Sequence, residues 1–397
     1  MSYAALIVLA LLVSAIAFPF ALRFAIKHHI VDNPNARKLQ KQPVPILGSI
    51  SVMAGITIPL FVGGFFRDPS TIYTYIAVLM LFIIGLTDDI KDISAIIRFM
   101  LELIVVWIMI WHPAYFDNGP MIDNLHGLFG RGHISLFTAF PLTMIAGVGI
   151  INAINMIDGV DGYSSGFGIL TNSLFAFIFF HVGQPALGTL AGITAAALVP
   201  MFFHNVFGKT SKMFIGDAGS LVIGLVLAYN TFSLLSGNGC GHELANHGIG
   251  VVALTLAIMS VPIFDTLRVM FGRIFEGRSP FMADKTHLHH LFIDMGFSHV
   301  GTSMTLIATN GIIVLTWYIS YLIGASVLWQ FIIVCLLAIL FTTGFYYFMR
   351  HQESTHSAIW QTMCRIGRKT HFEQKGIWHI MQKVVDWKMV PNNQPNN

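Results

Sequence analysis

About eleven long apolar runs divide this chain, and no stretch between them is long enough to form a separate soluble domain. A helical run of about 20 apolar residues matches the thickness of a lipid bilayer. Only 10% of the residues are charged, whereas a soluble domain carries about 25%. These features predict an all-α, polytopic membrane protein with about eleven transmembrane helices. The predicted spans are residues 3–22, 46–66, 71–86, 95–111, 136–154, 165–182, 186–206, 214–235, 248–270, 300–324 and 326–349.

Positive charge is distributed unevenly over the loops that join these runs. If the N-terminus lies outside, all of the 22 Lys and Arg residues except Arg67 and Arg131 fall in inner loops or in the tail. Positive residues concentrate on the cytoplasmic side of membrane proteins. The pattern therefore predicts an outside N-terminus, a cytoplasmic C-terminus and an active site on the cytoplasmic face, where the polar loops also lie. We expect no nucleic-acid partner.

The chain divides into a transmembrane part with cytoplasmic loops, residues 1–350, and a basic cytoplasmic tail, residues 351–397. In the tail, apolar residues recur at helical spacing over residues 372–387, with lysines between them. This spacing predicts an amphipathic helix that lies either on the inner membrane surface or on the protein's own inner loops. We expect the Asn-rich end after Pro391 to be disordered.

Three carboxylates, Asp88, Asp89 and Asp92, lie at the inner end of the third predicted span. On a helix, Asp88 and Asp92 share one face and Asp89 lies on the next. A hard cation such as Mg²⁺ relieves the repulsion between close carboxylates and prefers oxygen ligands. The cluster is therefore either a metal or substrate site or a solvated acidic loop.

A second polar group repeats every three residues at Asn152, Asn155, Asp158 and Asp161. If the segment is helical, these side chains form one polar stripe that leaves the membrane. We expect Gly159 and Gly162 to end the helix there and to let the backbone approach a ligand. A simple helix cap needs one such residue, so four favour a functional role.

The segment from Phe214 to Ser220 reads Phe-Ile-Gly-Asp-Ala-Gly-Ser and opens the eighth predicted span. Backbone N–H groups at a helix start bind anions, so this turn suits phosphate oxygens while Asp217 holds a metal. The alternative is that Asp217 is only an N-terminal cap.

Three histidines, His287, His289 and His290, lie close together between the ninth and tenth predicted spans. We find no cysteine or carboxylate near them in the sequence that would complete a zinc site. Imidazole and Arg side chains beside an acidic metal site suit diphosphate oxygens better. Together with the carboxylates, these histidines predict a Mg²⁺-dependent site for a diphosphate substrate. A secondary transporter is a less favoured alternative of a different class, since transporter carboxylates usually lie near the bilayer midplane within repeats, and we see no repeat in this sequence.

Taken in order, the motifs from Asp32 to His290 resemble those of the polyprenyl-phosphate N-acetylhexosamine-1-phosphate transferases, the MraY and WecA superfamily. The Asp88-Asp89-x-x-Asp92 form and the histidine loop are similar to the WecA branch. The resemblance implies a multi-pass enzyme of the bacterial inner membrane that transfers N-acetylglucosamine-1-phosphate from UDP-N-acetylglucosamine to undecaprenyl phosphate, with Mg²⁺ or Mn²⁺, and releases UMP. Another UDP-N-acetylhexosamine or UDP-MurNAc-pentapeptide remains an alternative donor, and the oligomeric state, a homodimer included, stays open.

The resemblance also assigns expected roles to individual residues. Asp217 is expected to ligate the metal with Asp88 or Asp89, either of which is also a candidate base, and His290 joins them as a catalytic residue. The expected substrate-binding residues are Asn152, Asn155, Asp158 and Asp161 for the nucleoside end, Phe214 for uracil, His287, His289, Arg273 and Arg278 for the diphosphate or sugar, and Lys38 and Lys41 for the lipid phosphate. Gln40, Ser49 and Tyr163 depart from the family pattern, and Gln40 stands where the family often has His.

Overall fold

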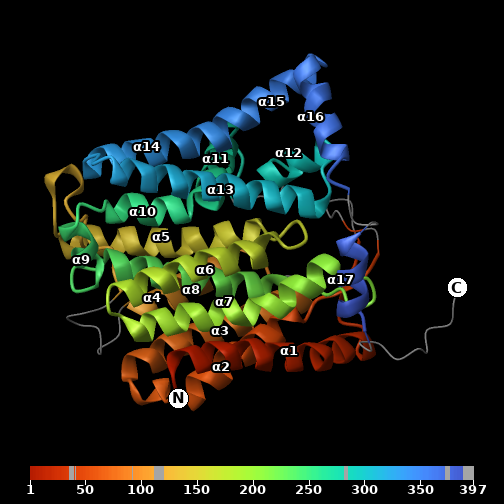
Figure 1. Cartoon of the computed structure of the whole chain (residues 1–397), viewed down its shortest axis with the longest axis horizontal. Coiled ribbons are helices and arrows are strands. Elements are labelled where there is room, and N and C mark those ends of the chain that lie inside the picture. Colours follow the sequence, from red (N-terminus) through yellow and green to blue (C-terminus); the bar gives the residue numbers. More distant parts are fainter. Residues whose placement is uncertain are drawn as a thin grey trace, which may run out of the picture.

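The computed structural model is a bundle of long helices that lie side by side, with α1 and α2 at one edge and α13 and α14 at the other (Figure 1). It describes residues 1–34, 40, 42–91, 93–110, 120–280, 285–371 and 376–387. All the predicted apolar runs are helical. Their helices are α1 (Tyr3–Lys27), α2 (Gly48–Val62), α3 (Pro69–Lys91), α4 (Ala95–Ile110), α5 (Leu136–Met156), α6 (Tyr163–His181), α7 (Pro185–Phe207), α8 (Gly216–Leu235), α10 (Val251–Ile258) with α11 (Ser260–Phe275), α13 (His299–Leu322), and α14 (Val327–Ile339) continued by α15 (Phe345–Ser354).

Eight helices of the described chain are long and apolar enough to cross a membrane, which supports a polytopic membrane protein. Helices α10 and α11 form a ninth candidate span that is bent by 78°, where the sequence predicted one continuous helix. Helix α2 is shorter, with 15 residues, and α4 has 16. The remaining elements are short: α9 (Gly241–Asn246), α12 (Leu288–Asp294), and an antiparallel pair of strands, β1 (Val31–Asp32) and β2 (Val44–Pro45).

The bend between α10 and α11 is stabilised by Asn310 on α13. Its Oδ1 accepts hydrogen bonds from Ser260 Oγ at 2.8 Å and from the backbone N–H of Val261 at 3.0 Å. Its Nδ2 donates to the carbonyl oxygen of Ile258 at 2.9 Å. In a membrane, backbone groups freed by a broken helix need protein partners, and Asn310 supplies them. The bend directs α11 toward the segment that carries the histidines.

Helix α8 lies at the centre of the bundle, and 94% of its membrane-length window is buried. Glycines let its neighbours approach closely. A Cβ at Gly85 of α3 would lie 2.3 Å from the Cα of Ala218, and one at Gly224 would lie 2.7 Å from the Cα of Ile151 on α5. Because real Cβ atoms do not approach so closely, both positions require glycine. This packing places the end of α3 and the end of α5 against the start of α8.

The tail forms two helices, α16 (Ala358–Arg368) and α17 (Ile377–Val385), at the end of the bundle where α7 finishes (Figure 1). The sequence predicted only the second of them. The ring of Trp378 on α17 lies 4.4 Å from that of Phe207 at the end of α7. One face of α17 therefore packs on the protein, as one of the two sequence-based alternatives proposed. The rest of the predicted amphipathic segment, residues 372–375, and the end of the chain from 388 lie outside the described residues.

Candidate functional site

A cavity of about 760 Å³ opens where α3 and α5 end and where α6 and α8 begin. Most of the residues that the sequence singled out line it. They are Asp88, Asp89, Asn155, Asp158, Asp161, Phe214, Asp217, Arg273, His287, His289 and His290. Cavities of this size commonly hold small-molecule ligands. The bundle thus brings four motifs that are far apart in the sequence to one place.

Asp89 anchors the start of α8. Its Oδ1 accepts a hydrogen bond from the backbone N–H of Asp217 at 2.7 Å, and its Oδ2 accepts one from Ala218 at 3.2 Å. Gly216 has φ +75°, and a Cβ there would lie 2.5 Å from Asp89 Oδ2. The anion at this helix start is therefore a carboxylate of the chain itself, where the sequence predicted a phosphate. Both oxygens of Asp89 have a structural role.

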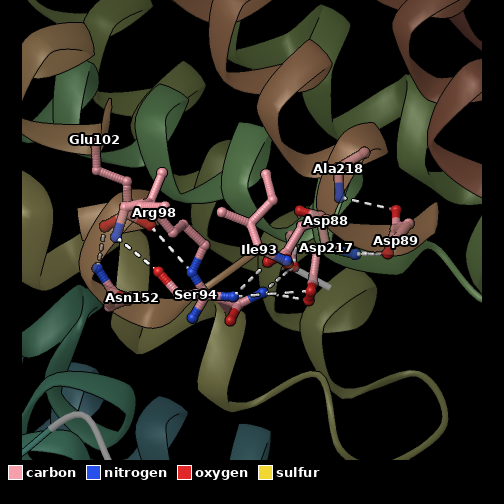
Figure 2. Close-up of polar contacts among 12 residues, drawn as sticks. Asp88, Asp89, Ile93, Ser94, Arg98, Glu102, Asn152, Asp217 and Ala218 are labelled. Carbon is pink, nitrogen blue, oxygen red and sulfur yellow. Dashed lines mark hydrogen bonds and ion pairs between the residues drawn. The ribbon is translucent and has the colours of Figure 1, made fainter. Parts of the chain in front are cut away.

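Asp88 and Asp217 lie next to each other beside Nη1 of the Arg98 guanidinium, as Figure 2 shows. Arg98 Nη1 donates to Asp88 Oδ2 at 2.8 Å and lies 3.8 Å from Asp217 Oδ2. The backbone N–H of Ile93 donates to the other oxygen of Asp88 at 2.7 Å. The Asp88 side chain is only 6% exposed, whereas that of Asp217 is 38% exposed. Of the two carboxylates, Asp217 is thus the one presented to a ligand.

Arg98 belongs to a network that sequence reasoning missed. Its Nε lies 3.6 Å from Glu102 Oε1, one turn further along α4. The other Glu102 oxygen accepts a hydrogen bond from Asn152 Nδ2, and Glu102 is fully buried. An Arg and a Glu four residues apart within an apolar run are costly in a membrane unless they are paired. The spacing of Arg98 and Glu102 within this apolar run was therefore the signal in the sequence that could have revealed the network.

The predicted polar stripe from Asn152 to Asp161 is divided in the structure. Helix α5 ends at Met156, so only the two asparagines lie on it. Asn152 bonds to Glu102 and is not among the cavity-lining residues, so its contact with a ligand stays a prediction. Asn155 Nδ2 donates to Asp217 Oδ1 at 2.7 Å and so orients that carboxylate.

The two aspartates of the stripe lie in the turn before α6, which starts after Gly162 at φ +74°. Burial raises the pKa of Asp158 well above its ordinary value, although Ser164 donates a hydrogen bond to it. Asp161 is paired with Lys212 Nζ at 2.6 Å, and His299 Nδ1 lies 3.4 Å away. This wall of the cavity therefore combines a half-buried carboxyl group, Asp158, with one that is paired to a cation, Asp161.

The histidine loop is held by a carboxylate, Asp265, that sequence analysis overlooked. Asp265 Oδ2 lies 3.0 Å from His287 Nδ1, and its Oδ1 accepts a hydrogen bond from Arg268 at 2.6 Å. Burial, together with the neighbouring imidazoles, lowers the pKa of His289 well below its ordinary value, so this ring is neutral near pH 7. A Cβ at Gly159 would lie 2.5 Å from His289 Nε2, so glycine is needed there for close contact.

Other predicted residues lie away from the cavity or outside the described chain. Arg278 is paired with Glu276 and does not line the cavity. Lys38, Lys41 and Asp92 fall among the residues that the structure does not describe. Gln40 does line the cavity, and its Nε2 donates to Asp32 Oδ2 at 2.6 Å.

Acidic and basic side chains lie close together around the cavity, so a ligand bound there would contact both kinds. Within the described residues, no three His, Cys, Asp or Glu side chains are arranged to hold a metal by themselves. Mg²⁺ commonly binds through one or two carboxylates together with substrate phosphates and waters. Asp217, with Asp88 beside it, fits that mode, because its oxygen faces the cavity.

Comparisons with known proteins are consistent across species. The family model described as "Glycosyl transferase family 4" matches residues 71–235. The undecaprenyl-phosphate alpha-N-acetylglucosaminyl 1-phosphate transferase of Escherichia coli (strain K12) is 31% identical over 283 residues, which cover 70% of this chain and 73% of that protein. The probable undecaprenyl-phosphate N-acetylglucosaminyl 1-phosphate transferase of Bacillus subtilis (strain 168) is 28% identical over 293 residues, covering 74% of this chain and 77% of that protein.

Proposed function

Because the chain belongs to glycosyl transferase family 4, we propose that it transfers N-acetylglucosamine-1-phosphate from UDP-N-acetylglucosamine to undecaprenyl phosphate and releases UMP. The observation that carries the proposal is the cavity at the end of the bundle, where the exposed carboxylate of Asp217 lies near Arg98. A reaction between a soluble nucleotide sugar and a lipid phosphate needs such a site at the membrane boundary. The metal ligands, the substrate contacts and the membrane orientation belong to the same proposal.

The reaction joins two anions, so neutralising and aligning them is the main task of the site. A phosphate oxygen of the acceptor attacks the β-phosphorus of the donor. The bond from that phosphorus to the UMP oxygen breaks, and UMP leaves with the electron pair. A phosphate monoester has a second pKa near 6 and needs little help to act as a nucleophile.

We assign metal binding to Asp217 and Asp88, with Asp89 as the anchor that fixes the start of α8. Bound Mg²⁺ or Mn²⁺ neutralises the diphosphate and the departing UMP. Asn155 orients Asp217, and Arg98 balances the charge of both carboxylates. Since a phosphate monoester is largely ionised near pH 7, we propose attack without a dedicated base.

The remaining cavity residues suit the donor. Phe214 and Asp158 lie on one wall, where we place uracil and ribose, and Lys212 lies 5.9 Å from the centre of the Phe214 ring. His289, His290 and Arg273 also line the cavity, and we place the diphosphate or the sugar beside them. Lys38 and Lys41 remain proposed contacts of the lipid phosphate.

The orientation is proposed from the charge pattern, and the bacterial inner membrane from the likeness to bacterial relatives. We propose eleven membrane crossings, an outside N-terminus and a cytoplasmic site in the bacterial inner membrane, with residues 1–350 as the catalytic part and residues 351–397 as a cytoplasmic tail. The product then starts a cell-surface glycan such as an O-antigen or enterobacterial common antigen.

The test uses detergent-purified protein with radiolabelled UDP-N-acetylglucosamine, undecaprenyl phosphate and Mg²⁺. We expect labelled lipid and an equal amount of UMP, and loss of both with a chelator. Glu243→Gln, at an exposed acid on α9, which lies at the opposite end of the bundle from α12 and α17 (Figure 1), is the control that keeps full activity. Unlabelled UDP-sugars added as competitors identify the sugar. If a folded preparation labels no lipid with any of a panel of UDP-sugars, the proposal is wrong.

A further inference from the structure

Helix α17 presents three different surfaces around its axis. With about 3.6 residues per turn, Trp378, Met381 and Val385 fall within an arc of about 60°. This side packs on the protein: Trp378 contacts Phe207, and Val385 is buried. We call it the docked face. His379 and Lys383 form an exposed polar strip beside it.

The third surface consists of Ile377, Ile380 and Val384, which also fall within about 60° of one another. We call it the exposed face of α17. These side chains are 78%, 61% and 64% exposed, although all three are large and apolar. Apolar side chains gathered in this way mark a surface that is covered in the working protein.

The position of the helix indicates what covers this face. Helix α17 lies at the end of α7, a candidate membrane span, and runs across the direction of the bundle helices in Figure 1. With α7 crossing the membrane, its end is the level at which lipid tails give way to headgroups. Lys383 borders the exposed face and Lys209 lies in the adjoining loop, so positive charge is placed for lipid phosphates.

We propose that α17 lies in the lipid headgroup layer at the cavity end of the bundle, with Ile377, Ile380 and Val384 inserted among the lipids. An apolar face flanked by Lys is the pattern of an interfacial helix. The inference concerns a lipid surface and does not depend on the proposed transferase reaction.

Such a helix also connects the lipid surface with the cavity wall. Asp386, just after α17, accepts hydrogen bonds from the backbone N–H groups of Lys209 at 3.1 Å and Ser211 at 2.9 Å. The next residue, Lys212, is the one that pairs with Asp161 of the cavity. Insertion of α17 in lipid therefore fixes the loop between α7 and α8 at the height of the membrane surface.

The test places spin labels on the full chain in nanodiscs that contain anionic lipid. Val384→Cys and Ile380→Cys report the exposed face, and His379→Cys on the polar strip is the matched control. All are made with Cys335→Ser and Cys364→Ser, while the buried Cys240 remains. We expect labels at 384 and 380 to collide more with oxygen, which concentrates in lipid, and the label at 379 to collide more with a water-soluble nickel chelate.

Two results would overturn the inference. If all three labels collide mainly with the nickel chelate, the face lies in water. If the labels at 384 and 380 are immobilised and broaden each other's spectra, a second copy of the chain covers the face instead. Because none of these readings needs substrate, failure here leaves the proposed reaction untouched.

Discussion

Two groups of carboxylates border the cavity or support it, and they differ in how far their charges are satisfied. Asp265 is 3% exposed and is bonded on both oxygens to Arg268, His287 and the backbone of Leu288. Asp217 has one oxygen bonded to Asn155, while the other lies 3.8 Å from Arg98 in a side chain that is 38% exposed. The charge of Asp265 is therefore satisfied by protein groups alone, whereas Asp217 can still bind a ligand.

The difference shows why an acidic residue near a site is not by itself a catalytic residue. A buried carboxylate whose partners are all protein groups fixes the positions of those groups. A carboxylate that is partly exposed in a cavity can still bind a cation. Substituting the buried, fully paired carboxylate should therefore lower stability, whereas substituting the partly exposed one should lower activity.

The largest effect is expected at Asp217. Asp217→Asn keeps the size of the side chain but removes the charge that we propose binds the metal, so kcat should fall on the order of 10³-fold. The unfolding temperature should stay close to that of the wild type, because the residue is partly exposed. Lipid-product formation over a Mg²⁺ series measures the effect. Near-normal kcat at saturating Mg²⁺ would show that Asp217 is not a metal ligand.

Asp265→Asn should produce the reverse result, with a large loss of stability. The buried Arg268 would lose its counter-charge, which costs about 3 kcal/mol, and His287 would lose a carboxylate partner. Asp294→Asn is the matched control, since its pair with Arg350 is 46% exposed on the Asp side and such pairs contribute less than about 1 kcal/mol. Thermal unfolding in detergent compares them, and equal losses would contradict the assignment of Asp265 as the support of the histidine loop.

This contrast also marks what could be predicted from the sequence. The apolar runs predicted every long helix, and the Gly-Asp-x-Gly-Ser turn correctly placed Asp217 at the start of α8, because both signals are local. The role of Asp89 as the cap of α8 could not be predicted, since its partners lie 128 and 129 residues away. Asp265 was missed because it lies within an apolar run, and its partner His287 is 22 residues further on. The bend at Met259 depends on Asn310, which no pattern in the bent segment reveals.

Arg98→Gln tests the charge balance on the ligand-binding side. Without the guanidinium, Asp88 and Asp217 should bind a divalent cation more tightly, while the anionic donor should bind more weakly. We expect shifts of about tenfold in each, equivalent to 1.4 kcal/mol. Mn²⁺ titration followed by electron paramagnetic resonance measures cation binding without turnover, and KM measures the donor. Arg278→Gln, whose partner is the exposed Glu276, should change neither value. Weaker Mn²⁺ binding in Arg98→Gln would mean that Arg98 positions the carboxylates more than it competes with the metal.

The smallest effect is expected from Asp158, which combines features of both groups: it lines the cavity, yet it is half-buried with a hydroxyl donor in place of a cation. Burial raises its pKa, so the folded chain retains a proton that the unfolded chain releases near pH 4. Its favourable contribution to stability is complete below that pH and is lost as pH rises through the folded pKa. Asp158→Asn, which does not ionise, should therefore become progressively more stable relative to the wild type as the pH rises from 5 to 8. Unfolding temperatures of the two proteins across this range measure the difference. If the unfolding temperatures of the two proteins change with pH in parallel, Asp158 is ionised at every pH tested and has a cationic partner in solution. Asp158 would then be a charge-paired carboxylate like Asp265.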